Sequence, residues 1–497
     1  MSASDFTRPS SRLPERPHIE QLRRQAAELQ RRYASGAPDA VALVTTELPD
    51  RPAPSAARLP RSVALLVVAR RYGFASWPRL KRHVELVTRY TRIPDQVPPS
   101  AEPAPEFLRL ACLTYTDDDG PHQWEQARRL LRGYPGIPDS SVHAAAAVAD
   151  PARVRRFLAD DPDTAGADGG PYRWPPLLYL AYARHDPDVP ERAVLDTARL
   201  LLSYGADPDA GYLWHGLPTP FTVLTGAFGE GEQGPTRQPR HPHQLALARL
   251  LLDAGADPND GQALYNRMFG PDDSHLTLLF RYGLGGGDGG PWRARLGDAV
   301  DSPAGLLRRQ LRHAVTHGLP DRVRRLAAHG VDLDSPFADG RTAGELAALH
   351  GHPEIAGFLA SHGAAGPALA GIDAVVAALL TADRAALDRL RAADPHAVDV
   401  TRAARPDLVR RATAAGRAEA VPLLVELGFD VDAAGPAAQT ALHTAVAADN
   451  PALVRLLLSL GAEPTRRDGR FDATPLDWAR HLGHQDLVRL LTPLTGE

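Results

Sequence analysis

The amino-acid sequence predicts an all-α protein that consists mainly of a long row of helix pairs. Apolar residues recur at helical spacing in pairs of short segments along most of the chain. A glycine follows the second segment of many pairs, where a helix end favours a residue that tolerates positive φ. These glycines lie 50, 28, 47, 33, 65 and 33 residues apart, at Gly205, Gly255, Gly283, Gly330, Gly363, Gly428 and Gly461. A spacing that returns to 33 residues predicts stacked repeats rather than separate globular cores.

The N-terminal part of the chain predicts a basic helical module preceded by a tail. Residues 1–17 are rich in Ser, Pro and Arg and have no apolar periodicity, so we expect them to be disordered. Residues 18–92 carry four helical patterns, the last of which begins after Ser76, a typical N-cap residue. The first 92 residues contain 16 Arg and one Lys against eight acidic residues, whereas the whole chain has a net charge of −4. The module is therefore basic and the remainder of the chain acidic.

A proline-rich segment, residues 93–105, follows the module. It contains five prolines and few apolar side chains, which is typical of a semi-rigid linker. We expect few contacts across such a linker, so that the module would be an independent domain. Helical pairs then continue over residues 106–495, and the first pair is irregular enough to be a terminal cap.

The most regular repeat lies near the C-terminus. Residues 440–468 read TALHTAVAADNPALVRLLLSLGAEPTRRD, and a variant, TPLDWARHLGHQDLVRLL, follows at residues 474–491. Each segment contains a threonine turn and two apolar helical stripes, and the second stripe of the first segment ends at Gly461. This pattern resembles the repeat of ankyrin-repeat proteins, in which a T-P-L-H-x-A turn opens the first helix and a G-A-x-P turn follows the second.

The resemblance implies a solenoid of about ten helix-turn-helix units over residues 106–495. It also implies a non-catalytic scaffold that binds a macromolecular partner, most simply another protein, through a concave groove. Residues that follow the opening turns should point toward that groove, and we select Arg312, Glu345, His443 and Trp478. The segment YGFASWPRLKRHVE, residues 72–85, is similar to a small helical module that precedes ankyrin repeats in some bacterial proteins, and this similarity implies no activity.

Two neighbouring repeats carry inserted residues at the same edge. The spacing between the two helices is nine residues longer than usual in the unit that opens at Trp174, and fifteen longer in the next. Because stacked repeats run parallel, we expect residues 183–195 and 226–244 to pack on each other. Aromatic, cationic and acidic side chains together are typical of a recognition site, and here they are Trp214, His215, Glu230, Glu232, Arg237 and His241. The alternative interpretation is a solvated loop above ordinary core aromatics.

Other functional classes find little support in the sequence. No apolar run approaches the roughly 20 residues of a membrane span, and the N-terminus lacks an apolar signal core. The single cysteine, Cys112, cannot form an internal disulfide, so we expect a cytoplasmic protein. The chain has no zinc-ligand spacing, phosphate-binding glycine loop or nucleophile motif, so we predict no metal, no cofactor and no enzymatic activity.

We therefore expect a monomeric, non-catalytic interaction protein with a protein partner. One alternative is a nucleic-acid-associated regulator, in which arginines of the basic module, residues 18–92, contact phosphates. Another alternative is an enzyme or small-ligand binder built on the inserted loops of residues 183–244.

Overall fold

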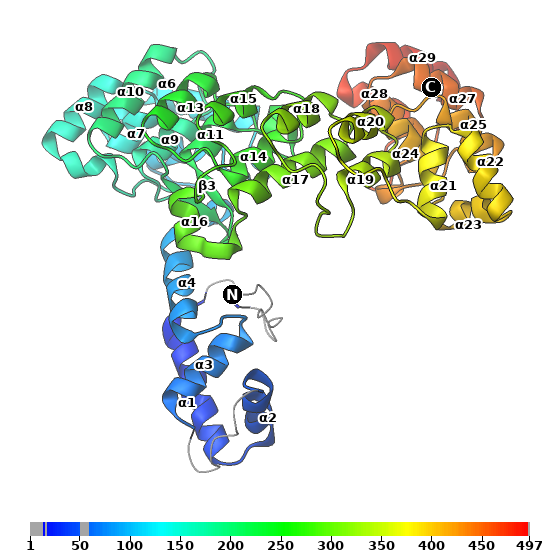
Figure 1. Cartoon of the computed structure of the whole chain (residues 1–497). Coiled ribbons are helices and arrows are strands. Elements are labelled where there is room, and N and C mark those ends of the chain that lie inside the picture. Colours follow the sequence, from blue (N-terminus) through cyan, green and yellow to red (C-terminus); the bar gives the residue numbers. More distant parts are fainter. Residues whose placement is uncertain (1–12, 15–16, 50–58, 496–497) are drawn as a thin grey trace. The chain divides into compact units, whose positions relative to one another are not determined.

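The computed structural model describes residues 13–14, 17–49 and 59–495 (Figure 1). These residues are mostly α-helical, as predicted, and they include three short strands. The tail predicted over residues 1–17 lies outside the described residues, apart from 13, 14 and 17. The chain divides into two compact units, and the boundary in the sequence lies between Leu306 and Leu307.

Four helices at the start of the first unit enclose a small core of their own. They are α1 (Ile19–Ala34), α2 (Pro38–Glu47), α3 (Arg61–Arg71) and α4 (Trp77–Tyr90). Ser76 accepts a hydrogen bond from the backbone N–H of Arg79, at 3.5 Å, and so caps α4 as predicted. The apolar side chains at helical spacing in α1 face this core, which comprises Leu22, Ala26, Leu29 and Tyr33 together with residues of the other three helices.

Helix pairs fill the rest of the first unit. Their helices are α5 (Pro103–Ala111), α6 (Pro121–Gly133), α7 (Val142–Ala147), α8 (Pro151–Asp160), α9 (Pro176–Tyr182), α10 (Glu191–Ser203), α11 (Val223–Phe228), α13 (Gln244–Asp253), α14 (Gly261–Arg267) and α15 (Ser274–Arg281). The first helices of successive pairs pack in one row, α5, α7, α9, α11 and α14, and the second helices α8, α10, α13 and α15 pack in another. Each pair thus buries its apolar face against its neighbours, as stacked repeats do.

Shorter elements lie before, between or after these pairs. They are α12 (Gly234–Arg237), α16 (Gly290–Leu296) and the 3-10 turns η1 (Pro94–Gln96), η2 (Ile137–Asp139), η3 (Pro162–Ala165) and η4 (Gly297–Ala299). The helix α12 belongs to the second inserted segment. The glycine-rich stretch before α16 separates α15 from α17 (Pro303–Thr316), which crosses the boundary between the units.

The second unit contains further helix pairs and one additional helix. Its remaining elements are α18 (Pro320–Ala328), α19 (Ala343–Leu349), α20 (Pro353–Ser361), α21 (Gly371–Leu380), α22 (Arg384–Ala393), α23 (Ala397–Ala404), α24 (Leu408–Ala414), α25 (Ala420–Glu426), η5 (Pro436–Ala438), α26 (Ala441–Ala447), α27 (Pro451–Ser459), α28 (Pro475–Leu482) and α29 (Gln485–Thr495). The pairs α26/α27 and α28/α29 coincide with the two segments of the most regular repeat. One continuous array from residue 106 to 495 stays a prediction.

The seven glycines that the sequence analysis placed after second helices all have positive φ, between 73° and 98°. An L side chain rarely adopts this conformation, so glycine allows the chain to leave the helix sharply and enter the next loop. The prediction of these helix ends is confirmed.

Three short strands form a sheet that the sequence analysis did not predict. They are β1 (Thr91–Arg92), β2 (Gly211–Trp214) and β3 (Pro220–Thr222), in the order β1-β2-β3. β1 runs parallel to β2, with Thr91 opposite Leu213, and β2 runs antiparallel to β3. Backbone pairing therefore connects the end of the N-terminal module to a hairpin of the repeats, where we had expected few contacts. The segment that we predicted as linker begins after this strand, and α5 starts at Pro103, three residues before the predicted array.

Candidate binding site on the inserted segments

The two inserted segments contact each other at the edge of the first unit. The first lies between α9 and α10 and the second between α11 and α13. A ring nitrogen of His243, in the second segment, lies 2.5 Å from the backbone oxygen of Val189, in the first, and the other ring nitrogen lies 3.5 Å from a carboxylate oxygen of Glu191. The prediction that residues 183–195 and 226–244 pack together is confirmed.

Arg184 joins the two segments from inside. Its guanidinium is buried and donates to four backbone oxygens, those of Pro239 at 2.8 Å, Gly226 at 2.5 Å, and Ala181 and Ala183 at 2.9 Å each. Burial lowers the pKa of Arg184 to about 10, so the group stays charged at neutral pH. A charged group with this many donors holds both segments in one arrangement.

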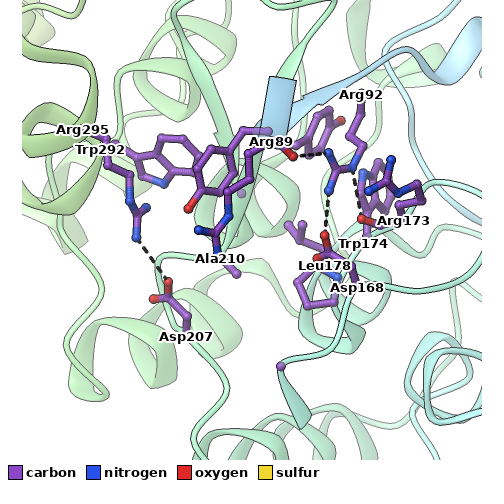
Figure 2. A pocket seen from close by; sticks show the side chains of 15 residues that line it. Arg89, Arg92, Asp168, Arg173, Trp174, Leu178, Asp207, Ala210, Trp292 and Arg295 are labelled. Carbon is purple, nitrogen blue, oxygen red and sulfur yellow. Dashed lines mark hydrogen bonds and ion pairs between the residues drawn. The ribbon is translucent and has the colours of Figure 1, made fainter. Parts of the chain in front are cut away.

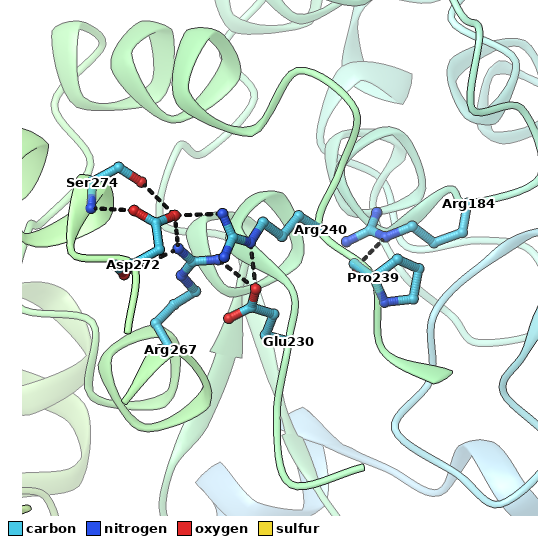
Figure 3. A network of polar contacts seen from close by, with 7 residues as sticks. All are labelled: Arg184, Glu230, Pro239, Arg240, Arg267, Asp272 and Ser274. Atoms are coloured by element: carbon cyan, nitrogen blue, oxygen red, sulfur yellow. Dashed lines mark hydrogen bonds and ion pairs between the residues drawn. The ribbon is translucent and has the colours of Figure 1, made fainter. Parts of the chain in front are cut away.

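An ion-pair network around one buried arginine anchors the start of the second segment (Figure 3). The side chain of Arg267, at the end of α14, is fully buried and lies 3.0 Å from Glu230 and 2.8 Å from Asp272. Arg240 also contacts both carboxylates. Asp272 accepts hydrogen bonds from the N–H and the hydroxyl of Ser274 at 2.9 and 3.0 Å. Glu230, which we predicted as a binding residue, is therefore part of the structural anchor and is only 9% exposed.

Glu232 and Arg237 lie closer to the tip of the second segment. Glu232 accepts a hydrogen bond from the hydroxyl of Tyr265, on α14. Arg237 donates to the backbone oxygens of Asp117 and Asp119, the latter at 3.3 Å. These contacts extend the anchor to α14 and to the turn after α5, and they leave neighbouring side chains such as that of Thr236 exposed.

His241 is buried beneath the same segment. Its Nδ1 accepts a hydrogen bond from the backbone N–H of His243 at 3.1 Å. Burial, with the nearby charges of Arg184 and His243, lowers the pKa of His241 well below its ordinary value. Its ring is therefore neutral at neutral pH and serves the packing of the segment rather than an exposed contact.

Trp214 is the last residue of the strand β2, and His215 follows it. The indole N–H of Trp214 donates to the backbone oxygen of Thr114 at 3.1 Å. The ring of His215 lies 2.7 Å from a carboxylate oxygen of Asp95, and its residue has a φ of +50°. Thr114 also donates to Asp119, so the turn over residues 114–119 links Trp214 to the segment that carries Arg237.

The four candidate groove residues lie in the second unit, and each has a local structural partner. Arg312 pairs with Asp339 at 2.7 Å, and Glu345 completes the capping box of α19 with Thr342. Trp478 donates its indole N–H to Asp468 at 2.9 Å. His443 is fully buried, where it caps α26 through Thr440 and lies 3.1 Å from the backbone oxygen of Ala473.

The basic module offers fewer free charges than its sequence indicates. Four of its cations form ion pairs with acidic neighbours, namely Arg23 with Glu20, Arg31 with Glu28, Arg32 with Asp39, and Lys81 with Glu85. Pairing of this kind reduces the positive potential that a phosphate backbone would meet. Within the described part of the chain, no three or more His, Cys, Asp or Glu side chains are grouped as a metal would require. No helix there is both long and apolar enough to cross a bilayer.

The buried side chain of His185, at the base of the first inserted segment, predicts that the stability of the protein depends on pH. His185 packs edge-on against Phe107 with ring centroids 5.0 Å apart, and its Nδ1 is buried without a partner. Burial, and secondarily the charge of Arg128, lowers the pKa of His185 from 6.5 to about 4. The unfolded chain therefore binds a proton before the folded chain does, so stability is greatest above pH 6.5 and falls between pH 6.5 and 4. We expect His185 to contribute a loss on the order of 3 kcal/mol over this window.

The measurement is urea unfolding of the wild type and His185→Leu at a series of pH values, followed by circular dichroism. The leucine variant should show a shallower decline in unfolding free energy over that window. His122→Leu, which changes an exposed histidine on α6, is the matched control and should keep the full decline. A pH profile of His185→Leu that superimposes on the wild type would contradict the prediction.

A set of arginines that the sequence analysis did not select lines a cavity elsewhere in the first unit. Arg89, Arg92, Arg173 and Arg295 come from α4, β1, the turn before α9, and α16. They are far apart in the sequence and match no motif. The only sequence signal was the excess of arginine in the N-terminal module, which led us to the alternative of phosphate contacts in a nucleic acid; Arg173 and Arg295 lie outside that module.

Known proteins are similar to the most regular repeats of this chain. A family model described as ankyrin repeats (3 copies) matches residues 409–496, which contain most of α24 and all of α25–α29. Notch-regulated ankyrin repeat-containing protein B of Danio rerio is 44% identical over 63 residues, which are 13% of this chain and 56% of that protein.

Two enzymes are also similar over part of their length. An L-asparaginase of Dirofilaria immitis is 31% identical over 178 residues, which are 35% of this chain and 30% of that protein. Glycerophosphocholine phosphodiesterase gde1 of Schizosaccharomyces pombe is 40% identical over 68 residues, which are 14% of this chain and 6% of that protein. The chain thus spans less than a third of either enzyme. Together with the helix pairs and glycine ends found there, the family match identifies residues 409–496 as ankyrin repeats.

Proposed function

We propose that the chain is a non-catalytic scaffold whose ankyrin repeats bind another protein and whose two inserted segments provide the specific contact. The observation that carries this proposal is that the two inserted segments are held rigidly at their base while their tips are exposed. Arg184 and the Arg267 network fix both segments from below, while Asp188 and Thr236 remain exposed above. A preorganised surface loses little conformational entropy on binding, so such an edge suits recognition.

We further propose that the repeats extend over residues 106–495 as about ten units after a divergent first pair, and that the chain acts as a monomer. The two packed rows of helices in the first unit support this extension. The regular pairs α26/α27 and α28/α29 support it in the second unit. In this arrangement each unit offers its turns and first helix to the partner, and the inserted segments widen that surface in the first unit.

The test uses Asp188→Arg/Thr236→Arg, which places two bulky cations on the tips of the inserted segments. Neither side chain takes part in the anchor, so the fold should survive. The control, Ala152→Arg/Asp160→Arg, makes the same charge change at exposed positions of α8. Circular dichroism should show the same helix content for all three proteins.

The partner is captured on the immobilised full chain from an extract of the source organism, identified by mass spectrometry, and then purified for calorimetric titration. We expect its affinity to fall at least about tenfold for the tip variant and less than about twofold for the control. Equal binding by both variants would place recognition on the repeats away from the inserted segments. The absence of any partner that binds in purified form would contradict the proposed function itself.

A further inference from the structure

A cavity of about 350 Å³ opens within the first unit, where the end of α4, the turn before α9, the strand β2 and α16 come together (Figure 2). This volume falls in the range of small-ligand sites. Its charged lining consists of four arginines and two aspartates, Arg89, Arg92, Arg173, Arg295, Asp168 and Asp207.

We call this cavity the arginine pocket. Arg92 holds its lining together through hydrogen bonds. Its side chain is only 9% exposed, and its guanidinium donates to Asp168 at 2.8 Å, to the backbone oxygen of Arg89 at 2.7 Å and to that of Arg173 at 3.1 Å. The buried guanidinium therefore fixes the backbone of two other arginines at the rim. Because its own charge is compensated by Asp168, Arg92 positions the pocket rather than supplying its free charge.

Arg173 occupies the tip of a tight turn. Its φ is +53°, which is rare for a residue with a side chain. The flanking residues Gly169 and Trp174 exchange two backbone hydrogen bonds of 3.0 and 3.1 Å, and these hold the turn closed. The Arg173 side chain is exposed and forms no ion pair with any residue that the structure describes.

Arg89 and Arg295 complete the positive lining from the other side. Arg295 lies over two aromatic rings, 4.9 Å from the centroid of Trp292 and 5.5 Å from that of Tyr90. Its nearest carboxylate, that of Asp207, is 3.9 Å away. Arg89 is exposed, lies 5.3 Å from the ring of Tyr90 and has no carboxylate partner among the described residues.

The aromatic wall keeps Arg295 in place. The indole N–H of Trp292 donates to the backbone oxygen of Asp209 at 2.8 Å, and Tyr90 packs edge-on against the indole with ring centroids 5.0 Å apart. Stacked guanidinium groups lose little side-chain entropy when they bind, because their orientation is already restricted. The pocket thus presents guanidinium groups from α4, the turn before α9 and α16, and ring contacts restrict those of Arg89 and Arg295.

The charges leave a net excess of two positive charges, since four arginines face two aspartates. Guanidinium groups bind phosphate oxygens through paired, charge-assisted hydrogen bonds, and a phosphate monoester carries close to two negative charges at neutral pH. We propose that the arginine pocket binds a phosphate group, either as the free ion or as part of a small phosphorylated molecule. Arg89, Arg173 and Arg295 contact its oxygens, and Arg92 holds the first two in place. This ligand site is separate from the proposed protein-binding edge.

The experiment is calorimetric titration of the full chain, in a buffer free of phosphate and sulfate, with inorganic phosphate, glycerol 3-phosphate and adenosine 5′-monophosphate. The test variant is Arg89→Gln/Arg173→Gln, which removes the two unpaired guanidinium groups. The control variant, Arg129→Gln/Arg132→Gln, removes two exposed arginines of α6 and changes the net charge equally. Thermal unfolding of each variant checks that the fold is retained.

We expect saturable binding of at least one of the three probes to the wild type. Its affinity should fall at least about tenfold in the Arg89/Arg173 variant and stay within about twofold in the control. The probe that binds most tightly distinguishes the free ion from a phosphorylated small molecule or a nucleotide. Failure of all three probes to bind at millimolar concentration would overturn the proposal, as would an equal loss of affinity in the control.

Discussion

Replacing Trp174 with alanine is expected to lower the unfolding free energy of the first unit by about 3–5 kcal/mol. The side chain is fully buried. Its indole stacks on Tyr212 with ring centroids 5.0 Å apart and lies 5.1 and 5.3 Å from the rings of Tyr182 and Tyr179. Removing it leaves a large cavity between α9 and β2, because helices that are packed on both sides cannot collapse to fill the space.

Urea unfolding followed by circular dichroism measures this effect, and hydrogen exchange localises it to α9 and β2. Trp174→Phe is the matched variant, since it keeps an aromatic ring and removes an indole N–H that is buried without a partner. We expect the phenylalanine variant to lose far less stability than the alanine variant. Equal losses in the two variants would contradict this expectation, because they would mean that a phenyl ring restores none of the packing that the indole provides.

Glu230→Ala is expected to cost on the order of 3 kcal/mol, because it removes one carboxylate from the buried network. Arg267 would keep Asp272 at 2.8 Å but lose Glu230 at 3.0 Å, so part of its charge would be buried without compensation. Arg240 would lose the same partner. The same change should release the second inserted segment and weaken binding of the protein partner.

Thermal unfolding and hydrogen exchange of residues 226–244 provide the measurement. Asp188→Ala removes an equal charge from an exposed position of the first inserted segment, outside the network, and should cost less than about 0.5 kcal/mol. A cost below about 1 kcal/mol for Glu230→Ala would show that the buried pairs contribute little to the stability of the segment.

The features that the sequence predicted well depend on spacing. The positive φ of the seven glycines and the contact between the inserted segments both follow from counting residues within a repeat. The sheet and the arginine pocket could not be found in this way. Thr91 pairs with Leu213, and the pocket combines arginines from Arg89 to Arg295, so neither leaves a local pattern.

The candidate binding residues show a related difficulty. Glu345 and His443 each stand three residues after a threonine, and at that position a polar side chain can cap the helix instead of facing a partner. Glu230 was selected for its charge and proved to be buried. Residue type and spacing alone do not separate an anchoring charge from an exposed one, because the distinction depends on Arg267, which lies in the next repeat.

The pairing of β1 with β2 also constrains the order in which parts of the chain can fold during synthesis. Thr91 and Leu213 are separated by about 120 residues, so their pairing closes a long loop, whereas stacked repeats contact mainly their immediate neighbours. During synthesis the N-terminal helices emerge first, yet the strand at their end has no partner until the hairpin after α10 has left the ribosome. The helices α1–α4 are thus joined to the repeats only after several repeats have been synthesised.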